Sequence, residues 1–390
     1  MKIKPGTYLQ VIVFILITAY TTAYARTTSL SIGIPIPLTG DLKEFGLTMK
    51  DAFELAKDTI NHSGGIDGKV VHLLYADDKG SVSGVSSAFK QLESKSVMLV
   101  GGYASDPTYL MAEMAEKADI PFLICSASAD KITQRRWKNV FRLNPPISEY
   151  TKGLEDFFVK HLKPNSMAIV YENSSFGTNG ALRMIEFCQK QAIEIKFSFP
   201  YDKTRTDPVY YRTLLAQLKT DIPDVIYMVS YLEDAVRLVK HIKELQLDSY
   251  LCGGAGGFTL SEFIKKTPEI SEKLLVAAPW SQHAPYPKSK IFAREYLERY
   301  GVNPDYHAAE AYSALLVAAY ALQHAESFNS RDIRESLNKT FLKTPFGPVK
   351  FYSYELFERQ NSINTLVLQI IDGKFETVWP LDLASKPYVR

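Results

Sequence analysis

Short polar loops follow several apolar segments of this 390-residue chain, and they carry side chains suited to binding a small molecule. Ser105 lies in "YASDPTYL" after "VMLVGG", and Ser128 lies in "SASADK" after "PFLIC". Serine hydroxyls and unpaired N–H groups at two neighbouring helix starts would together bind a carboxylate. Helix capping without a ligand explains either loop alone equally well, and we interpret Asp106 as the cap before Pro107.

Aromatic side chains occupy similar loops in the middle of the chain. Phe176 lies in "YENSSFG" and Tyr231 lies in "MVSYLED", each just after an apolar run. Both could belong to a core, but their polar neighbours favour the wall of a pocket that stacks on a ligand.

Signatures of catalysis or metal binding are weak. "GSVSG" has Val82 where a nucleophilic serine would stand, and neither "GGIDGK" nor "GGAGG" has the spacing of a phosphate or dinucleotide loop. The histidines form no His-x-x-x-His pair, so we interpret those in helical segments as surface or core-edge residues: His161, His241 and His307. We expect no enzyme, no metal and no cofactor.

The composition is that of a globular protein, and its nearly balanced charge favours a small soluble molecule as the binding partner. The chain is 46% hydrophobic and 23% charged with a formal charge of +2, so it can form two domains and offers no basic surface for nucleic acid. Only three cysteines occur, which excludes a disulfide framework and leaves a pairing of Cys188 with Cys252 open.

The N-terminal residues have the pattern of a signal peptide. Lys2 and Lys4 precede the apolar "VIVFILITAY", and Ala23 and Ala25 fit the small-residue cleavage rule. We expect cleavage after Ala25, with a permanent signal anchor as the alternative.

From residue 29 onward, β-rich runs alternate with segments of helical period. "LSIGIPI", "VVHLLYA", "SVMLVGG" and "PFLIC" alternate with helical stretches, and the pattern restarts with "MAIVYE", "DVIYMVS" and "SYLCGG". Such alternation predicts an α/β fold of two Rossmann-like lobes with parallel sheets and a ligand cleft between them. The segments "GPVKFY", "INTLVLQII" and "KFETVWP" predict antiparallel strands near the end of the chain.

The order of many small motifs resembles one family over nearly the whole mature chain. "IGIPIPLTGDLKEFG", "AFELAKDTINHSGGIDGK", "YADDKG", "VGGYASDPT", "IPFLICSASADKIT", "VYENSSFG" and "TPFGPVKF" follow one another as in the leucine/isoleucine/valine-type substrate-binding proteins of ABC transporters. The resemblance implies two lobes joined by a three-crossover hinge that close on a small solute. We expect residues 1–25 as signal peptide, 26–146 with 279–345 as the N-terminal lobe, and 147–278 with 346–390 as the C-terminal lobe.

The resemblance also implies ligand-binding residues. Ser105 and Ser128 would hold a carboxylate, with backbone groups around Ala127 assisting. The resemblance further implies an aromatic wall formed by Phe45, Tyr103, Phe176 and Tyr231. Ala255 would lie in the loop opposite this wall.

One departure from the family pattern concerns charge. Where amino-acid binders place an acid for the ligand ammonium, this chain reads "CGGAGGF" around Ala255. A buried ammonium without a counter-charge is costly, which favours a carboxylate with an apolar or aromatic body. Asp106, Glu172 or Glu233 could supply the charge from another direction, so an amino acid stays open.

The resemblance predicts a monomeric periplasmic protein that captures a small carboxylate-bearing compound and delivers it to the membrane permease of an ABC transporter. The alternative is a periplasmic sensor that presents the bound solute to a receptor. An exported enzyme on the same scaffold ranks last, because no nucleophile, base and orienting group emerge together.

Overall fold

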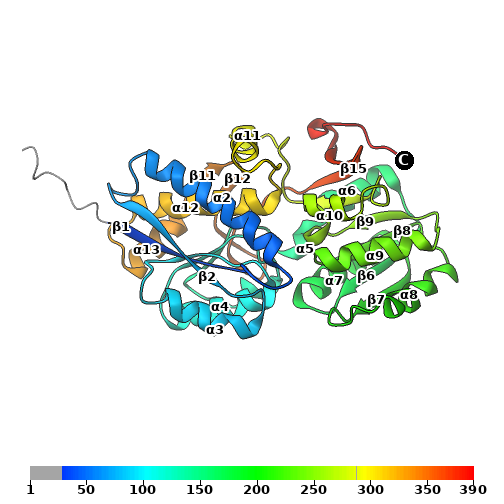
Figure 1. Ribbon diagram of the computed structural model, residues 1–390, viewed down its shortest axis with the longest axis horizontal. Helices are drawn as coiled ribbons and strands as arrows, with labels where there is room; N and C mark the ends of the chain where they lie inside the picture. Colours follow the sequence, from blue (N-terminus) through cyan, green and yellow to red (C-terminus); the bar gives the residue numbers. More distant parts are fainter. Residues whose placement is uncertain (1–28, 287) are drawn as a thin grey trace, which may run out of the picture.

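The computed structural model describes residues 29–286 and 288–390 and shows two α/β lobes side by side (Figure 1). The expected signal peptide and its cleavage site lie outside the described residues. Each lobe has a seven-stranded, mostly parallel sheet covered by helices. This confirms the predicted fold class.

The first sheet forms the core of the N-terminal lobe in the order β13-β14-β5-β4-β3-β1-β2, and only β13 is antiparallel to its neighbour. Its strands are β1 (Ser29–Ile36), β2 (Val70–Asp77), β3 (Leu99–Gly101), β4 (Phe122–Ile124), β5 (Val140–Arg142), β13 (Tyr352–Tyr354) and β14 (Phe357–Gln360).

Helices cover both faces of this sheet, with α2 and α12 on one side and α3 and α4 on the other (Figure 1). The helical elements are α2 (Lys43–His62), α3 (Val82–Leu92), α4 (Ser105–Lys117), η1 (Asp130–Ile132), α11 (Ser289–Tyr300), α12 (Tyr306–His324) and α13 (Ser330–Lys339). A separate hairpin pairs β11 (Phe341–Thr344) with β12 (Gly347–Lys350).

The second sheet has the order β16-β15-β10-β9-β8-β6-β7, and β15 and β16 are antiparallel, as the sequence predicted for this part of the chain. Its strands are β6 (Ser166–Glu172), β7 (Glu194–Tyr201), β8 (Val225–Val229), β9 (Tyr250–Gly253), β10 (Leu275–Ala278), β15 (Leu366–Ile371) and β16 (Lys374–Trp379). The accompanying helical elements are α5 (Ile147–Tyr150), α6 (Lys152–Phe157), η2 (Phe158–Leu162), α7 (Ser175–Gln191), α8 (Pro208–Ala216), η3 (Gln217–Lys219), α9 (Leu232–Glu244), η4 (Gly256–Thr259), α10 (Ser261–Lys266) and η5 (Leu381–Leu383).

The chain passes between the sheets three times, after β5, after β10 and after β14. The third passage differs from the boundary expected at 345/346. Strands β13 and β14 belong to the first sheet, where β14 pairs with β5 through Gln360 and Arg142. The fully buried Arg142 guanidinium donates to Oε1 of Gln360 at 2.6 Å, so this strand supplies a partner that the buried arginine needs.

The entrance to α2 depends on a glycine. Helix α2 begins next to Pro37, and a Cβ at Gly46 would lie 1.6 Å from the Pro37 carbonyl oxygen. Only glycine allows the first turn of α2 to pack this closely on the end of β1, and this contact places Phe45 at the cleft.

All three cysteines are buried and their thiols are free, which answers the open question of a Cys188–Cys252 bridge. Within residues 29–286 and 288–390, no helix has the length and apolarity to cross a membrane. The same residues contain no group of three His, Cys, Asp or Glu side chains placed to hold a metal ion.

Candidate ligand site between the lobes

Loops that follow the carboxyl ends of strands in both sheets meet in one pocket between the lobes. The N-terminal lobe contributes Tyr103, Ser105, Ser126, Ser128, Tyr306 and His307, and the C-terminal lobe contributes Tyr150, Phe176, Tyr231 and Gly256. The free volume is about 10 Å³, close to what one water molecule requires, because aromatic side chains fill the space. A ligand of amino-acid size would enter only when the lobes move apart.

Three buried serines form the polar wall of this pocket: Ser105, Ser126 and Ser128. The Ser105 oxygen accepts a hydrogen bond from the Ala129 N–H at 3.1 Å. Because the oxygen is an acceptor there, the Ser105 hydroxyl hydrogen can be donated to a ligand. Ser105 is also the first residue of α4, where the helix dipole favours a negative group.

The backbone N–H of Ala127 is bonded within the protein in this structure. Its N–H donates to the Gly102 carbonyl at 3.1 Å, and its side chain packs in the apolar cluster under β4. Ala127 is not among the residues that line the pocket. This N–H, one of the backbone groups around Ala127 that were expected to assist the ligand, thus joins the loop after β4 to the loop after β3.

The aromatic wall spans both lobes. Phe45, in the first turn of α2, is fully buried and stacks on Tyr103 with ring centroids 4.5 Å apart. Tyr103 lies 5.8 Å from Tyr231 of the other lobe, and Tyr231 stacks on Phe176 at 5.2 Å. The four predicted aromatic residues thus form one continuous contact across the cleft.

Ala255 lies buried immediately before Gly256, at the end of β9. Its φ is +63° with ψ −148°, a conformation normally left to glycine. The loop presents the Gly256 N–H, which donates to the Tyr306 hydroxyl across the cleft at 3.2 Å. Like Phe45, Ala255 stands next to the pocket lining instead of in it.

Helix α12 contributes two residues that were not predicted as part of the site, Tyr306 and His307. His307 is buried, lines the pocket and meets Phe45 edge to face with centroids 5.1 Å apart, which corrects its interpretation as a surface or core-edge residue. Its Nδ1 lies 3.2 Å from Oδ2 of Asp305. The composition of α12 could have indicated that this helix is buried. Among its nineteen residues, Glu310 is the only one that is Asp, Glu, Lys or Arg.

The acids considered as counter-charges differ in their partners. Asp106 accepts hydrogen bonds from Lys131, and Glu233 is paired with Lys266. Glu172 is fully buried at the end of β6, where the Ser174 hydroxyl donates to it, and its Oε2 has no hydrogen-bond partner among the described residues. Burial raises the pKa of Glu172 to about 7.

Asp106 joins the lobes instead of capping its own helix. Helix α4 begins at Ser105, two residues before the predicted start at Pro107, and its start has no side-chain cap. The Asp106 carboxylate accepts from the Ser175 hydroxyl at 2.6 Å and from Lys131 Nζ at 2.8 Å. Since Ser175 belongs to α7, this group bridges the cleft.

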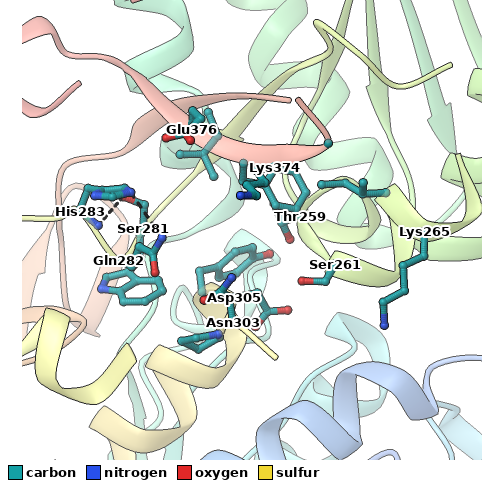
Figure 2. A pocket seen from close by; sticks show the side chains of 17 residues that line it. Thr259, Ser261, Lys265, Ser281, Gln282, His283, Asn303, Asp305, Lys374 and Glu376 are labelled. Atoms are coloured by element: carbon teal, nitrogen blue, oxygen red, sulfur yellow. Dashed lines mark hydrogen bonds between the residues drawn. The ribbon is translucent and has the colours of Figure 1, made fainter. Parts of the chain in front are cut away.

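A second pocket of about 270 Å³ lies beside the passage after β10, with Tyr306 in its wall as in that of the cleft pocket. Figure 2 shows Lys374 and Glu376 of β16 on one side, and Asn303 and Asp305 on the other. Its acids have partners within the protein, since Asp305 caps α12 and Glu376 accepts from Ser385. None of the eight sequence-predicted site residues lines it, so the cleft pocket is the stronger candidate.

Comparisons with known proteins agree with this architecture. A family model described as "Periplasmic binding protein" matches residues 29–373. "Leu/Ile/Val-binding protein homolog 7" of Brucella melitensis is 23% identical over 377 residues, covering 93% of this chain and 94% of that protein. The substrate-binding protein LivJ of the branched-chain amino acid transporter of Streptococcus pneumoniae, solved with isoleucine, superposes with a TM-score of 0.82 at 24% identity, covering 90% of this chain and all of the other. A solute-binding protein from R. palustris, solved with benzoate, has a TM-score of 0.79 at 16% identity, with coverages of 90% and 95%.

Proposed function

Because the chain belongs to the periplasmic binding protein family, we propose that it captures a small carboxylate-bearing compound by closing its two lobes. Family membership confirms the expectation of a binding protein instead of an enzyme. We further propose that a simple carboxylic acid is the favoured ligand and that the protein delivers the ligand to a membrane permease.

The observation that carries the proposal is the pocket between the lobes, where a serine wall faces an aromatic wall. Ser105 has a hydroxyl hydrogen available at a helix start, and no Lys, Arg, Asp or Glu lines the pocket. Hydroxyl and N–H donors without a full opposite charge suit a carboxylate, and the aromatic rings suit an apolar body.

Two ligand classes fit these walls, α-amino acids and simple aliphatic or aromatic acids. Isoleucine and benzoate, the ligands of the two similar solved proteins, belong to one class each. The loop at Ala255 has no acid to meet an ammonium, so we favour the simple acids. Of the three acids considered, Asp106 and Glu233 form salt bridges with lysines, whereas Glu172 forms none among the described residues.

Delivery completes the proposed role. The protein would act in the periplasm after removal of residues 1–25, and the permease of an ABC transporter would recognise its closed form. Closure would occur by rotation about the three passages between the lobes.

A thermal-shift screen of the mature chain tests this proposal. The screen would compare branched-chain amino acids with their desamino acids and with benzoate. A ligand at about 100 times its Kd adds about 2.7 kcal/mol to the free energy of unfolding. Stabilisation by at least one of these carboxylates, but not by the matching amides, is the expected result. Equal stabilisation by the amides, or none by any carboxylate, would contradict it.

A further inference from the structure

Glu310 lies directly behind the serine wall of the cleft pocket. It is fully buried on α12, and its Oε2 lies 2.6 Å from the Ser126 hydroxyl oxygen, which lines the pocket. Its other oxygen, Oε1, has no hydrogen-bond partner among the described residues. The carboxyl group therefore touches the ligand site through one side chain only.

Among the described residues, no Lys, Arg or His side chain forms an ion pair with this carboxyl, whose one hydrogen-bond partner is Ser126. The titratable groups that interact with it are Cys125 at the end of β4, Tyr150 on α5, and Asp305 and Tyr306 at the start of α12. A buried carboxylate with no cation is strongly disfavoured, and the charge of Asp305 disfavours it further. Burial accordingly raises the pKa of Glu310 well above its usual range.

The protonation of Glu310 decides what Ser126 offers to the pocket. If Glu310 is ionised, Ser126 must donate its hydrogen to Oε2 and turns only lone pairs to a ligand. If Glu310 is neutral, its own O–H can donate to the Ser126 oxygen, and the Ser126 hydrogen is free to be donated into the pocket.

We propose that Glu310 is a proton-bearing positioning residue that orients the Ser126 hydroxyl as a donor and thereby selects carboxylate ligands. This inference rests on the proposed function and adds a second hydroxyl donor to that of Ser105. It also gives a role to the acid on this mainly apolar helix. The acid must be neutral for this role, because an ionised Glu310 would repel carboxylate ligands.

The opposite role for Glu310 is an ionised counter-charge for a ligand ammonium, and matched ligands separate the two. The probes are L-isoleucine, 3-methylpentanoate, which has the same skeleton without the ammonium, and benzoate. Isothermal titration would be applied to the wild type, Glu310→Leu and Glu310→Gln. Glu113→Gln serves as a control, because Glu113 lies on the outer surface of α4 and is paired with Lys117.

Under our proposal, Glu310→Leu weakens 3-methylpentanoate or benzoate by about tenfold, because Ser126 loses its hydrogen-bond donor. Glu310→Gln restores most of the affinity, since its amide donates to Ser126 without being able to ionise. The control leaves the affinity unchanged. A Glu310→Gln variant that loses isoleucine but keeps 3-methylpentanoate would overturn the proposal in favour of the counter-charge.

Infrared difference spectra of the wild type minus Glu310→Gln at about pH 7 test the protonation without any ligand. The expected result is the C=O band of a protonated carboxylic acid, present in the wild type and absent from the variant. If this band is missing, the inference about Glu310 is wrong, and the proposed function of the protein is not affected. If no carboxylate binds the wild type, the proposed function is contradicted, and the selective role of Glu310 falls with it.

Discussion

The Ser175 hydroxyl donates a hydrogen bond to Oδ1 of Asp106 at 2.6 Å and joins the first turn of α7 to the first turn of α4. Lys131 Nζ donates to both residues, at 2.7 Å to Ser175 and 2.8 Å to Asp106. These contacts connect two lobes whose relative position decides whether a ligand is enclosed. We therefore expect the bridge to favour the closed arrangement.

Ser175→Ala removes the hydroxyl contact to Asp106 but leaves Asp106 paired with Lys131 and leaves the Ser175 N–H, which donates to Oδ2 of Asp106 at 3.4 Å. Both charged side chains are about 40% exposed, so solvent reduces the energy of the bridge. We expect ligand affinity to fall by about two- to fivefold, with a change in unfolding free energy below about 1 kcal/mol. Calorimetric titration and urea unfolding would measure the two effects, with exposed Ser87 on α3 mutated to Ala as the control. A large loss of stability without a change in affinity would contradict this role.

Phe45→Ala tests the aromatic wall. Phe45 is fully buried and contacts Tyr103, Tyr231 and His307. Loss of the ring should cost about 3–5 kcal/mol of unfolding free energy and should also weaken ligand binding. Denaturant unfolding would check the first effect, with Leu182→Ala at an exposed position of α7 as the control. A cost below about 1 kcal/mol would show that the ring is not packed as described.

Gly46→Ala tests the entrance to α2. The added Cβ would meet the Pro37 carbonyl oxygen at 1.6 Å, so the start of the helix must shift. We expect a loss of about 3 kcal/mol or more, or no soluble protein. Leu47→Ala, at the next and exposed position, should cost less than about 1 kcal/mol in the same unfolding assay. Equal effects of the two substitutions would contradict the close packing.

Glu172→Gln should stabilise the protein in a pH-dependent way. The pKa of Glu172 is raised from 4.5 to about 7, so the folded state holds this proton more tightly than the unfolded state. The free energy of unfolding of the wild type therefore falls as pH rises from about 4.5 to 7, by up to about 3 kcal/mol. The variant cannot ionise, so its advantage should be larger at about pH 8 than at pH 4.5 when both proteins are unfolded with urea. An equal difference at the two pH values would show that Glu172 does not titrate in this window.

Local patterns in the sequence predicted most of the fold. The alternation of apolar runs with helical periods indicated both lobes, and the last segments of the chain indicated antiparallel strands. These features depend on residues close together in the chain. The strands that end the first sheet were assigned to the wrong side of the third passage because Arg142 and Gln360, which decide the pairing, are far apart in sequence.

Part of the lining of the candidate pocket was predicted. Tyr103, Ser105, Ser128, Phe176 and Tyr231 line one pocket, as the loops after strand ends suggested. His307 was interpreted as a surface or core-edge residue and Glu310 was missed, whereas both lie on α12, which is buried on nearly all sides. Asp106 was interpreted as a cap because Ser175, its partner across the cleft, cannot be identified from spacing alone.

The central claim is that a carboxylate is bound between the lobes through the Ser105 hydroxyl. Isothermal titration of the wild type and Ser105→Ala with isoleucine, 3-methylpentanoate and benzoate tests it most directly. We predict that at least one of these carboxylates binds the wild type and that Ser105→Ala weakens it by about tenfold or more, as expected for a lost hydrogen bond to a charged group. Binding that is unaffected by Ser105→Ala, or no binding of any carboxylate, would contradict the claim.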